Sequence, residues 1–465
     1  MVSSYSRLST FCEDNGRMSF ALFLLYLIVI LLRPTEFFQL NLEGARPIFW
    51  LWVCAFVSST VHAVARAEAA AKSTHFVLLG FFLLTIVVSQ LRQGWLGGAA
   101  YAFFQFSTSA GLFVLICLNA TTLKRLRTTC AVVLACVTII ATISTISFHT
   151  GMMSQQLVVK QTSGDDALES FSTADSAIPA DDKSGQFLYR IRGLGFLNDP
   201  NDLAQAIVMV LPFLWGLSRK GRGARNLLVV WLPGAVLGYA IYLTHSRGAL
   251  IALASLFFFG LRRLLGTART ALVMAAGGAL VVVAGFGGGR QFSTGEESAN
   301  LRVEAWYSGL EMLKSNLLLG VGYGNFTDHH VRTAHNSFVL CFAELGVIGY
   351  FFWVALIVLV FQGLNKVVVN APERAPEREF ATLLRSSFIG VMTCAWFLSR
   401  TYQATLFLLL GLGAAGWYCW AILAESPAEL AERRTLKWVL PTLGTMAVAF
   451  GSVYAVILLD ALLLK

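Results

Sequence analysis

The sequence predicts an all-α protein that crosses a membrane many times, and three observations carry this prediction. Of the 465 residues, 56% are hydrophobic and only 13% are charged, whereas soluble domains carry about a quarter charged residues. Apolar stretches of about 18 or more residues recur along the whole chain, each long enough to cross a hydrocarbon core of about 30 Å. These stretches lack the period-two alternation of barrel strands. We therefore expect a single membrane domain, residues 1–465, with about 12 to 13 transmembrane helices.

The expected spans begin near residues 18, 47, 74, 98, 127, 198, 226, 248, 270, 336, 384, 404 and 438. The first span continues into RPTEFF without a small-residue cleavage site, so we interpret it as a retained anchor and not as a signal peptide. An odd number of spans would place the two chain ends on opposite sides of the membrane.

The distribution of Lys and Arg predicts which side each connection faces. One alternate set of connections, together with the N-terminal segment, contains 21 of the 35 basic residues: 66–72, 124–127, 219–225, 261–269, 366–385 and 432–437. Because basic residues favour the cytoplasmic side, we expect this set and the N-terminus to lie inside the cell. The formal net charge of +9 follows from the same rule. Basic segments beside acidic membrane lipids account for it, and no nucleic-acid partner is implied.

Two connections on the predicted outer, periplasmic side are long, 149–197 and 289–335. The first contains an acidic, Ser- and Ala-rich insert at 163–182 without periodicity, which is typical of a mobile segment. In the second, four apolar residues recur at helical spacing and predict an amphipathic helix on the outer surface: Leu301, Trp306, Leu310 and Leu313. Neither loop contains any of the eight cysteines, so no disulfide framework is expected.

Several polar residues that are far apart in the sequence converge on this outer face. They are Arg190 and Arg192 at the end of the first loop, Arg247 in THSRGAL, Arg302 in the second loop, and His335 with Asn336 at the start of a span. An interfacial arginine with its stem in the membrane is the simpler interpretation of Arg247, and a helix-start histidine that of His335. However, the positive-inside rule disfavours a basic residue in a short outer turn, so Arg247 indicates a functional charge.

Three other polar motifs have simple structural interpretations. In NDPND, Asn and Asp are good helix caps and Pro fits a first helical turn, with Asn201 as the residue that could do more. The glycines of GVGYGNF lack the lysine of a phosphate-binding loop and predict a tight turn. The histidines of DHHVRTAH match no standard zinc spacing.

The ordered motifs GLGFLNDPNDLA, THSRGALIAL, NLRVEAW with LLLGVGYGNF, and AHNSFVLCFAELGVIGY together resemble the O-antigen ligase and O-antigen polymerase superfamily over about residues 190–350. The resemblance implies a glycosyltransferase of the bacterial inner membrane that needs neither a metal nor a nucleotide cofactor. It implies an undecaprenyl-diphosphate-linked glycan as donor and lipid A-core or a growing glycan as acceptor, within lipopolysaccharide biosynthesis. The acidic insert and a thirteenth span depart from the family pattern, so the choice between ligase and polymerase stays open.

The resemblance also assigns roles. Arg192, Arg302 and His335 match the essential outer-face arginines and histidine of the family, and Arg247 matches its SRG arginine. We expect His335, Arg302 and Arg192 to be catalytic, and Arg247, Arg190, Asn201 and Asn336 to bind substrate.

This assignment agrees with the chemistry of the residues themselves. A sugar on a diphosphate already has a good leaving group, so the protein must stabilise the departing charge, and guanidinium groups do this by bidentate hydrogen bonding. The acceptor hydroxyl needs a base, and a histidine kept neutral by nearby arginines can serve. Glu344 comes nine residues after His335, a rotation of about 900° on a continuous helix. We therefore expect it on the opposite face, as a packing or hydrogen-bonding residue.

A lipid-linked glycan flippase or another polytopic transporter is the alternative. Transporters place ionisable groups and broken helices near the middle of the bilayer, whereas the unusual charges here are expected at one rim.

Overall fold

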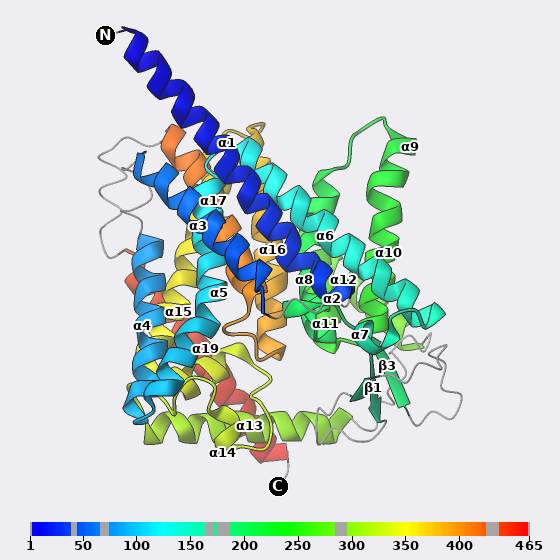
Figure 1. Cartoon of the computed structure of the whole chain (residues 1–465). Coiled ribbons are helices and arrows are strands. Elements are labelled where there is room, and N and C mark those ends of the chain that lie inside the picture. The colour runs from blue at the N-terminus through cyan, green and yellow to red at the C-terminus, as the bar shows by residue number, and fades with distance from the viewer. Residues whose placement is uncertain are drawn as a thin grey trace.

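The computed structural model describes residues 2–38, 44–65, 74–162, 172–173, 187–283, 295–424 and 437–463. These residues form a helical bundle whose long helices run between two ends (Figure 1). Within them, nine helices are long and apolar enough to cross a membrane: α1 (Val2–Leu32), α4 (Thr74–Arg92), α5 (Leu96–Asn119), α6 (Leu123–Thr150), α10 (Leu232–Thr244) with the turns before it, α15 (Ser337–Asn370), α16 (Pro376–Phe397), α17 (Ala404–Ala424) and α19 (Val439–Leu463). The predicted all-α, polytopic fold class is confirmed.

The remaining predicted spans are also helices, although they are shorter or more polar. They are α3 (Pro47–Ala65), α8 (Pro200–Gly216), α11 (Arg247–Leu265) and α12 (Thr267–Val283). The turns before α10 are α9 (Gly223–Asn226) and the π-helical turn η2 (Leu227–Trp231), which is followed by Pro233. A proline cannot donate a backbone hydrogen bond, which accounts for the irregular turn before it.

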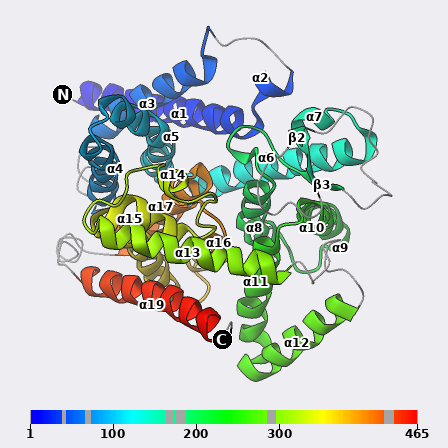
Figure 2. The same ribbon diagram turned by 90° about the horizontal axis from the view of Figure 1, so that it is seen from below.

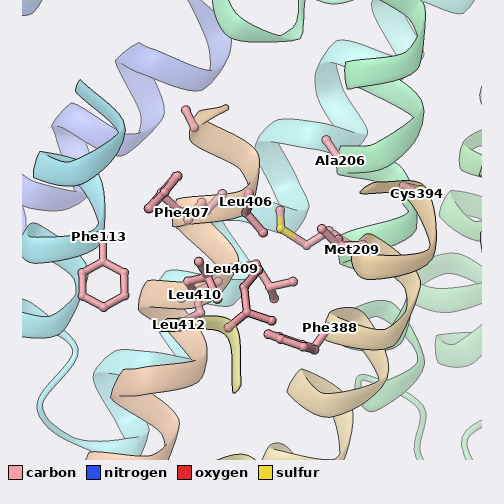
Figure 3. Packing of buried hydrophobic residues seen from close by; sticks show 14 of the residues in the cluster. Phe113, Ala206, Met209, Phe388, Cys394, Leu406, Phe407, Leu409, Leu410 and Leu412 are labelled. Atoms are coloured by element: carbon pink, nitrogen blue, oxygen red, sulfur yellow. The ribbon is translucent and has the colours of Figure 1, made fainter. Parts of the chain in front are cut away.

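Helix α17 forms the centre of the bundle, and its buried leucines and phenylalanine pack between α5 on one side and α8 and α16 on the other (Figure 3). Its glycines allow close approach, since a Cβ at Gly411 would lie 3.3 Å from the Cα of Phe113 on α5. Small residues at helix contacts stabilise membrane bundles because dispersion contacts replace the hydrophobic driving force.

One end of the bundle is covered by the segments between the spans. Helix α13 (Gly295–Ser315) lies across this end, transverse to the long helices, and packs against α15 and α19 (Figures 1 and 2). Its residues Trp306, Leu310 and Leu313 are buried, as the predicted amphipathic pattern requires. The short helix α14 (Phe326–His329) lies at the same end. We call it the outer end, following the predicted orientation.

A small antiparallel sheet at the outer end was not predicted. Strands β1 (Val158–Thr162), β2 (Ser172–Thr173) and β3 (Phe187–Ile191) have the order β2-β1-β3. The sheet is preceded by α7 (Ser154–Leu157) and followed by the 3-10 turn η1 (Gly195–Leu197). Apart from Ser172 and Thr173, the acidic insert 163–182 lies outside the described residues.

Helix α15 is interrupted near its outer end. Gly346 has φ 62° and ψ −166°, which breaks the helical hydrogen-bond ladder. The turn segment 317–322 inserts here: Val321 and Gly322 donate to the carbonyls of Ala343 and Glu344 at 2.9 Å, and Val347 donates to Leu317 at 2.9 Å. The inserted segment thus satisfies backbone groups that would otherwise be unpaired within the membrane. This segment and the residues directly after it have positive φ at Gly320, Gly322 and Gly324, which confirms the predicted tight turn.

Candidate active site

A cavity of about 710 Å³ lies between the helices and the outer-end segments. Its lining comes from α1, α5, η1, the first turn of α8, residues 323–335, α15 and the turn 398–404 between α16 and α17. Among the predicted site residues, His335 and Asn201 line this cavity. Segments that are hundreds of residues apart therefore form one polar space at the outer end of the bundle.

Hydrogen bonds of the residues directly before and after His335 fix its position. Its backbone is in the left-handed region, with φ 47°, an uncommon conformation for a residue with a side chain. On one side, the indole Nε1 of Trp306 on α13 donates to the carbonyl of Ala334 at 2.9 Å. On the other, the Asn336 side chain caps α15 by accepting from the backbone N–H groups of Phe338 and Val339 at 2.9 and 3.3 Å. Strain at a residue held in this way is typical of functional sites.

His335 lies among positive charges and is partly buried. Burial, and after it the neighbouring guanidinium groups of Arg302, Arg400 and Arg332, together lower its pKa to about 4, against an opposing contribution from Asp199. The predicted effect of nearby arginines therefore agrees with the structure. At neutral pH the imidazole is uncharged and can accept a proton.

Arg400, in the turn 398–404, is a cavity residue that our sequence reasoning missed. Its guanidinium forms ion pairs with both carboxylates of the NDPND motif: Nη2 lies 3.0 Å from Asp199 Oδ2, and Nε contacts Asp202 Oδ1. Its backbone N–H donates to the Ser337 hydroxyl at 2.9 Å, which links the turn to the start of α15. The signal was present in the sequence, because Arg400 is another basic residue in a short turn on the predicted outer side.

The NDPND motif consequently does more than cap a helix. Asp199 caps α8 as expected, accepting from the backbone N–H of Asn201 at 2.7 Å. The same carboxylate also holds Arg400, and the Asn201 amide oxygen accepts from Arg190 Nη2 at 3.2 Å. The motif therefore connects two arginines to the first turn of α8.

Glu344 lines the same cavity as His335, although helical rotation predicted opposite faces. The difference arises because His335 precedes the helix and has left-handed backbone geometry. Glu344 is buried and accepts from the Tyr402 hydroxyl at 2.8 Å and from the Phe326 backbone N–H at 3.2 Å. It is thus a hydrogen-bonding residue, as predicted, and it ties the glycine turn and the 398–404 turn to α15.

Arg190 and Arg192 form hydrogen bonds with neighbouring segments of the outer end. Among the described residues, neither contributes to the cavity lining. Arg190 is buried and its Nε donates to the Thr244 carbonyl at 2.8 Å. Arg192 donates to the carbonyls of Gln156 and Gln155 at 2.8 and 3.2 Å, and burial lowers its pKa despite the nearby Asp199. Both arginines brace the sheet region against the helices.

The other predicted residues lie at different distances from the cavity. Arg302, on α13, acts on the charge of His335 from outside the described lining. Arg247 is exposed at the start of α11 and is also outside that lining. Asn336 is completely buried, and its side chain serves as the cap of α15. The structure thus gathers His335, Asn201 and Arg302 at the site and leaves Arg247 at its periphery.

The part of the chain that the structure describes contains no group of three or more His, Cys, Asp or Glu side chains that could hold a metal ion. His330 instead accepts from the backbone N–H of Arg332 through Nδ1 at 3.1 Å, which shapes the loop before His335.

These features define a multi-pass membrane protein with a polar cavity at one end of its helix bundle and a neutral histidine held at the cavity wall. Residues 232–354 match the Wzy_C family, described as O-Antigen ligase. The resemblance predicted from the sequence is confirmed. The matched segment contains Arg247, Arg302 and His335, whereas Arg192 and Arg400 lie outside it. No curated protein gives a match.

Proposed function

We propose that this protein is a glycosyltransferase of the bacterial inner membrane with its active site facing the periplasm. It transfers a glycan from an undecaprenyl diphosphate carrier to a sugar hydroxyl, as an O-antigen ligase acting on lipid A-core or as the related polymerase acting on a growing glycan. The O-antigen ligase domain at 232–354 supports the reaction class. The cavity supports the location, because it is formed at the end of the bundle that carries the motifs of that domain.

This proposal mainly depends on the position of His335 at the cavity wall, where burial and nearby arginines lower its pKa. In the proposed reaction the acceptor oxygen forms a bond to the anomeric carbon while that carbon loses its bond to the diphosphate. His335 takes the hydroxyl proton, and the diphosphate leaves with the bonding electron pair. Direct displacement in this way inverts the anomeric centre. A general base of this kind contributes about 10² to 10⁴ in rate.

The arginines at the site supply the positive charge that the departing diphosphate needs. Arg400 lines the cavity, and Arg302 is close enough to shift the pKa of His335. In the proposed mechanism both stabilise the developing negative charge, which is worth most in a site shielded from water. Arg190 and Arg192 hold the surrounding turns in place, and Arg247 contacts the donor at the edge of the site.

The test uses purified protein in lipid vesicles with an undecaprenyl-diphosphate glycan and candidate acceptors, followed by analysis for a new glycosidic product. We expect product without added metal or nucleotide, and a rate about 10² to 10⁴ lower for His335→Ala with donor binding retained. His329→Ala serves as the matched control, since His329 is exposed, lies six residues earlier and is outside the described cavity lining. Transfer by His335→Ala at the parent rate would remove the histidine from the mechanism.

The break in α15 favours a second candidate, a lipid-linked glycan flippase, because transporters often use interrupted helices. The break begins at Ala343, about 9 Å from the start of the helix, whereas transporter breaks lie near the bilayer centre. It also serves to anchor the glycine turn beside the cavity. Vesicles that show movement of a fluorescent lipid-linked glycan across the bilayer, without any glycosidic product, would establish the transporter instead.

A further inference from the structure

Arg33 is a cavity residue that lies far from the matched segment in the sequence. It follows directly after the membrane helix α1 and forms the junction to the short helix α2 (Pro34–Phe37). Its side chain lines the same cavity as His335 and Arg400. Its backbone is in the left-handed region, with φ 48° and ψ 58°. This conformation is unfavourable for a residue with a side chain, so the surrounding contacts must hold it there.

Two interactions hold the Arg33 guanidinium in one orientation. Its Nη1 donates to Glu36 Oε1 at 3.0 Å, and the other oxygen of the same carboxylate accepts from the Gly195 backbone N–H at 3.0 Å. Glu36 therefore fixes the arginine and the cavity wall to each other. The ion pair occupies only one nitrogen of the guanidinium and leaves the edge formed by Nε and Nη2.

The Nε of Arg33 is buried and has no hydrogen-bond partner among the described residues. A buried donor without a partner is destabilising, and more so when the group is charged. A ligand oxygen in the cavity would remove this cost. The Nε–Nη2 edge presents two parallel N–H donors, the arrangement that matches two oxygens of one phosphate.

Gly195 provides the space in which this guanidinium lies. Its φ is +57°, and a Cβ at this position would collide with Arg33 Nε and would lie only 2.8 Å from Arg33 Cγ. Any other residue would displace the arginine. Gly195, the second glycine in GLGFLNDPNDLA, therefore provides the space for an arginine that comes from the end of the first membrane helix.

We propose that Arg33 binds a phosphate group carried on a lipid, through its Nε–Nη2 edge, inside the cavity that contains His335. The proposal rests on the proposed function and adds a binding residue to it. Arg33 lies at the end of a membrane-spanning helix, and the ends of such helices reach the depth at which lipid-borne phosphates lie. Arg400 is already paired with two carboxylates, whereas the single carboxylate beside Arg33 leaves one edge of its guanidinium available.

The experiment measures binding of farnesyl diphosphate to the purified full-length protein in detergent, with vesicles of phosphatidylglycerol as a second probe. We expect Arg33→Ala to weaken farnesyl diphosphate binding by about 10- to 100-fold, the loss expected for a charge-assisted, bidentate contact. Arg33→Lys should be weakened as well, because it keeps the charge and loses the fork. Arg46→Ala is the matched control, since Arg46 lies directly before the next helix, α3, also has positive φ and is exposed.

A second pair of variants tests the same site without removing the arginine. Gly195→Ala should weaken binding as Arg33→Ala does, because the new methyl group displaces the guanidinium. Gly94→Ala places a methyl group at a similar φ of +74° with nothing within 4 Å, so it controls for backbone strain. Thermal unfolding of each variant shows that it is folded.

The outcomes separate this proposal from the proposed function. Selective loss of farnesyl diphosphate binding assigns the phosphate to the glycan donor, and equal loss for phosphatidylglycerol assigns it to a membrane lipid; both support the anion site. Unchanged binding of both probes by folded Arg33→Ala overturns it and leaves the proposed function standing. A parent protein that binds no farnesyl diphosphate but still transfers glycan overturns the Arg33 site alone. A parent protein that neither binds the probe nor transfers glycan overturns the proposed function.

Discussion

The Trp306 indole Nε1 donates to the Ala334 carbonyl at 2.9 Å, so the transverse helix α13 holds the residue immediately before His335. The Trp306 ring also packs against Trp396 of α16, with 6.2 Å between ring centroids. Through these two contacts α13 fixes the backbone next to His335, the proposed base. A helix that crosses the end of a bundle therefore determines the geometry of a site that it does not line.

Replacing Trp306 by Phe should separate positioning from chemistry. The ring contact is largely kept, but the hydrogen bond to Ala334 is lost, and small displacements of a catalytic group can cost up to about 10² in rate. We expect a lower kcat with little change in donor KM, together with a loss of about 1 kcal/mol in stability. Tyr307→Phe, at an exposed neighbour on α13, is the control. A parent-like kcat for folded Trp306→Phe would show that this contact does not position His335.

The pH dependence of transfer should reflect the lowered pKa of His335. Because the folded protein holds this pKa at about 4, the imidazole stays neutral well below the usual 6.5. The rate should therefore be flat from pH 7 down to about 5 and fall as the pH approaches 4. Arg302→Ala removes a charge that lowers the pKa, so the acid limb of its residual activity should move to higher pH. NMR titration of the imidazole in both proteins gives the pKa directly, and an unshifted value in Arg302→Ala would contradict the prediction.

Arg400→Ala should reduce both stability and transfer. Asp202 is buried and Asp199 is mostly buried, so removal of the guanidinium leaves two carboxylates unpaired, at a cost of about 3 kcal/mol. Replacing both carboxylates by Asn in the same protein should restore much of the thermal stability but not the activity. If the triple variant transferred glycan normally, Arg400 would be only a partner of the two aspartates.

The break in α15 should be intolerant of any side chain at Gly346. Its φ is positive, and a Cβ there would collide with the backbone of Leu318, so Gly346→Ala must separate the inserted segment from the helix. We expect a loss of several kcal/mol or failure to fold, measured by thermal unfolding and yield of monodisperse protein. Gly80→Ala on α4, with nothing within 4 Å, should be neutral or slightly stabilising.

The orientation of the chain can be tested by labelling. With the native cysteines removed, single cysteines at Ser170 and Ser298 should react with an impermeant thiol reagent in intact spheroplasts, and one at Gly221 should not. Both serines lie in the two long loops predicted to be periplasmic, and Gly221 lies in a basic connection predicted to be cytoplasmic. Labelling of Gly221 from outside would invert the orientation and place the cavity on the cytoplasmic side.

Much of the fold could be predicted because apolar length is a strong signal in a membrane protein. Each expected span is a helix in the structure, and the apolar spacing of α13 correctly indicated its buried face. The break at Gly346 was not predicted, because it depends on pairing with residues 317–322, which the local sequence does not show. The small sheet was missed for the same reason, since β1 and β3 pair across the acidic insert.

A residue of the candidate site could be predicted only where its type departs from the pattern of the residues around it. His335 opens an apolar helix, and the structure places it at the cavity. Arg400 and Arg33 carry similar signals on the predicted outer side, but their roles depend on contacts with Asp199, Asp202 and Gly195, which are distant in the sequence. In contrast, Arg190 and Arg192 donate to backbone carbonyls, and Arg190 donates also to the Asn201 side chain, contacts that no pattern of residue types reveals.

The cavity wall formed by α5 has an evolutionary consequence. Tyr101, Gln105 and Thr108 recur at helical spacing on this helix and present hydroxyl and amide groups to the cavity. Helix α5 lies outside the matched segment 232–354, whereas Trp306 and Asn336, which fix the backbone around His335, lie inside it. If the proposed function holds, substitutions on α5 alter which sugar fits while the contacts around His335 stay intact. On that proposal, the residues that select the glycan and the residues that hold the proposed base lie in separate stretches of the chain, and each set can change without the other.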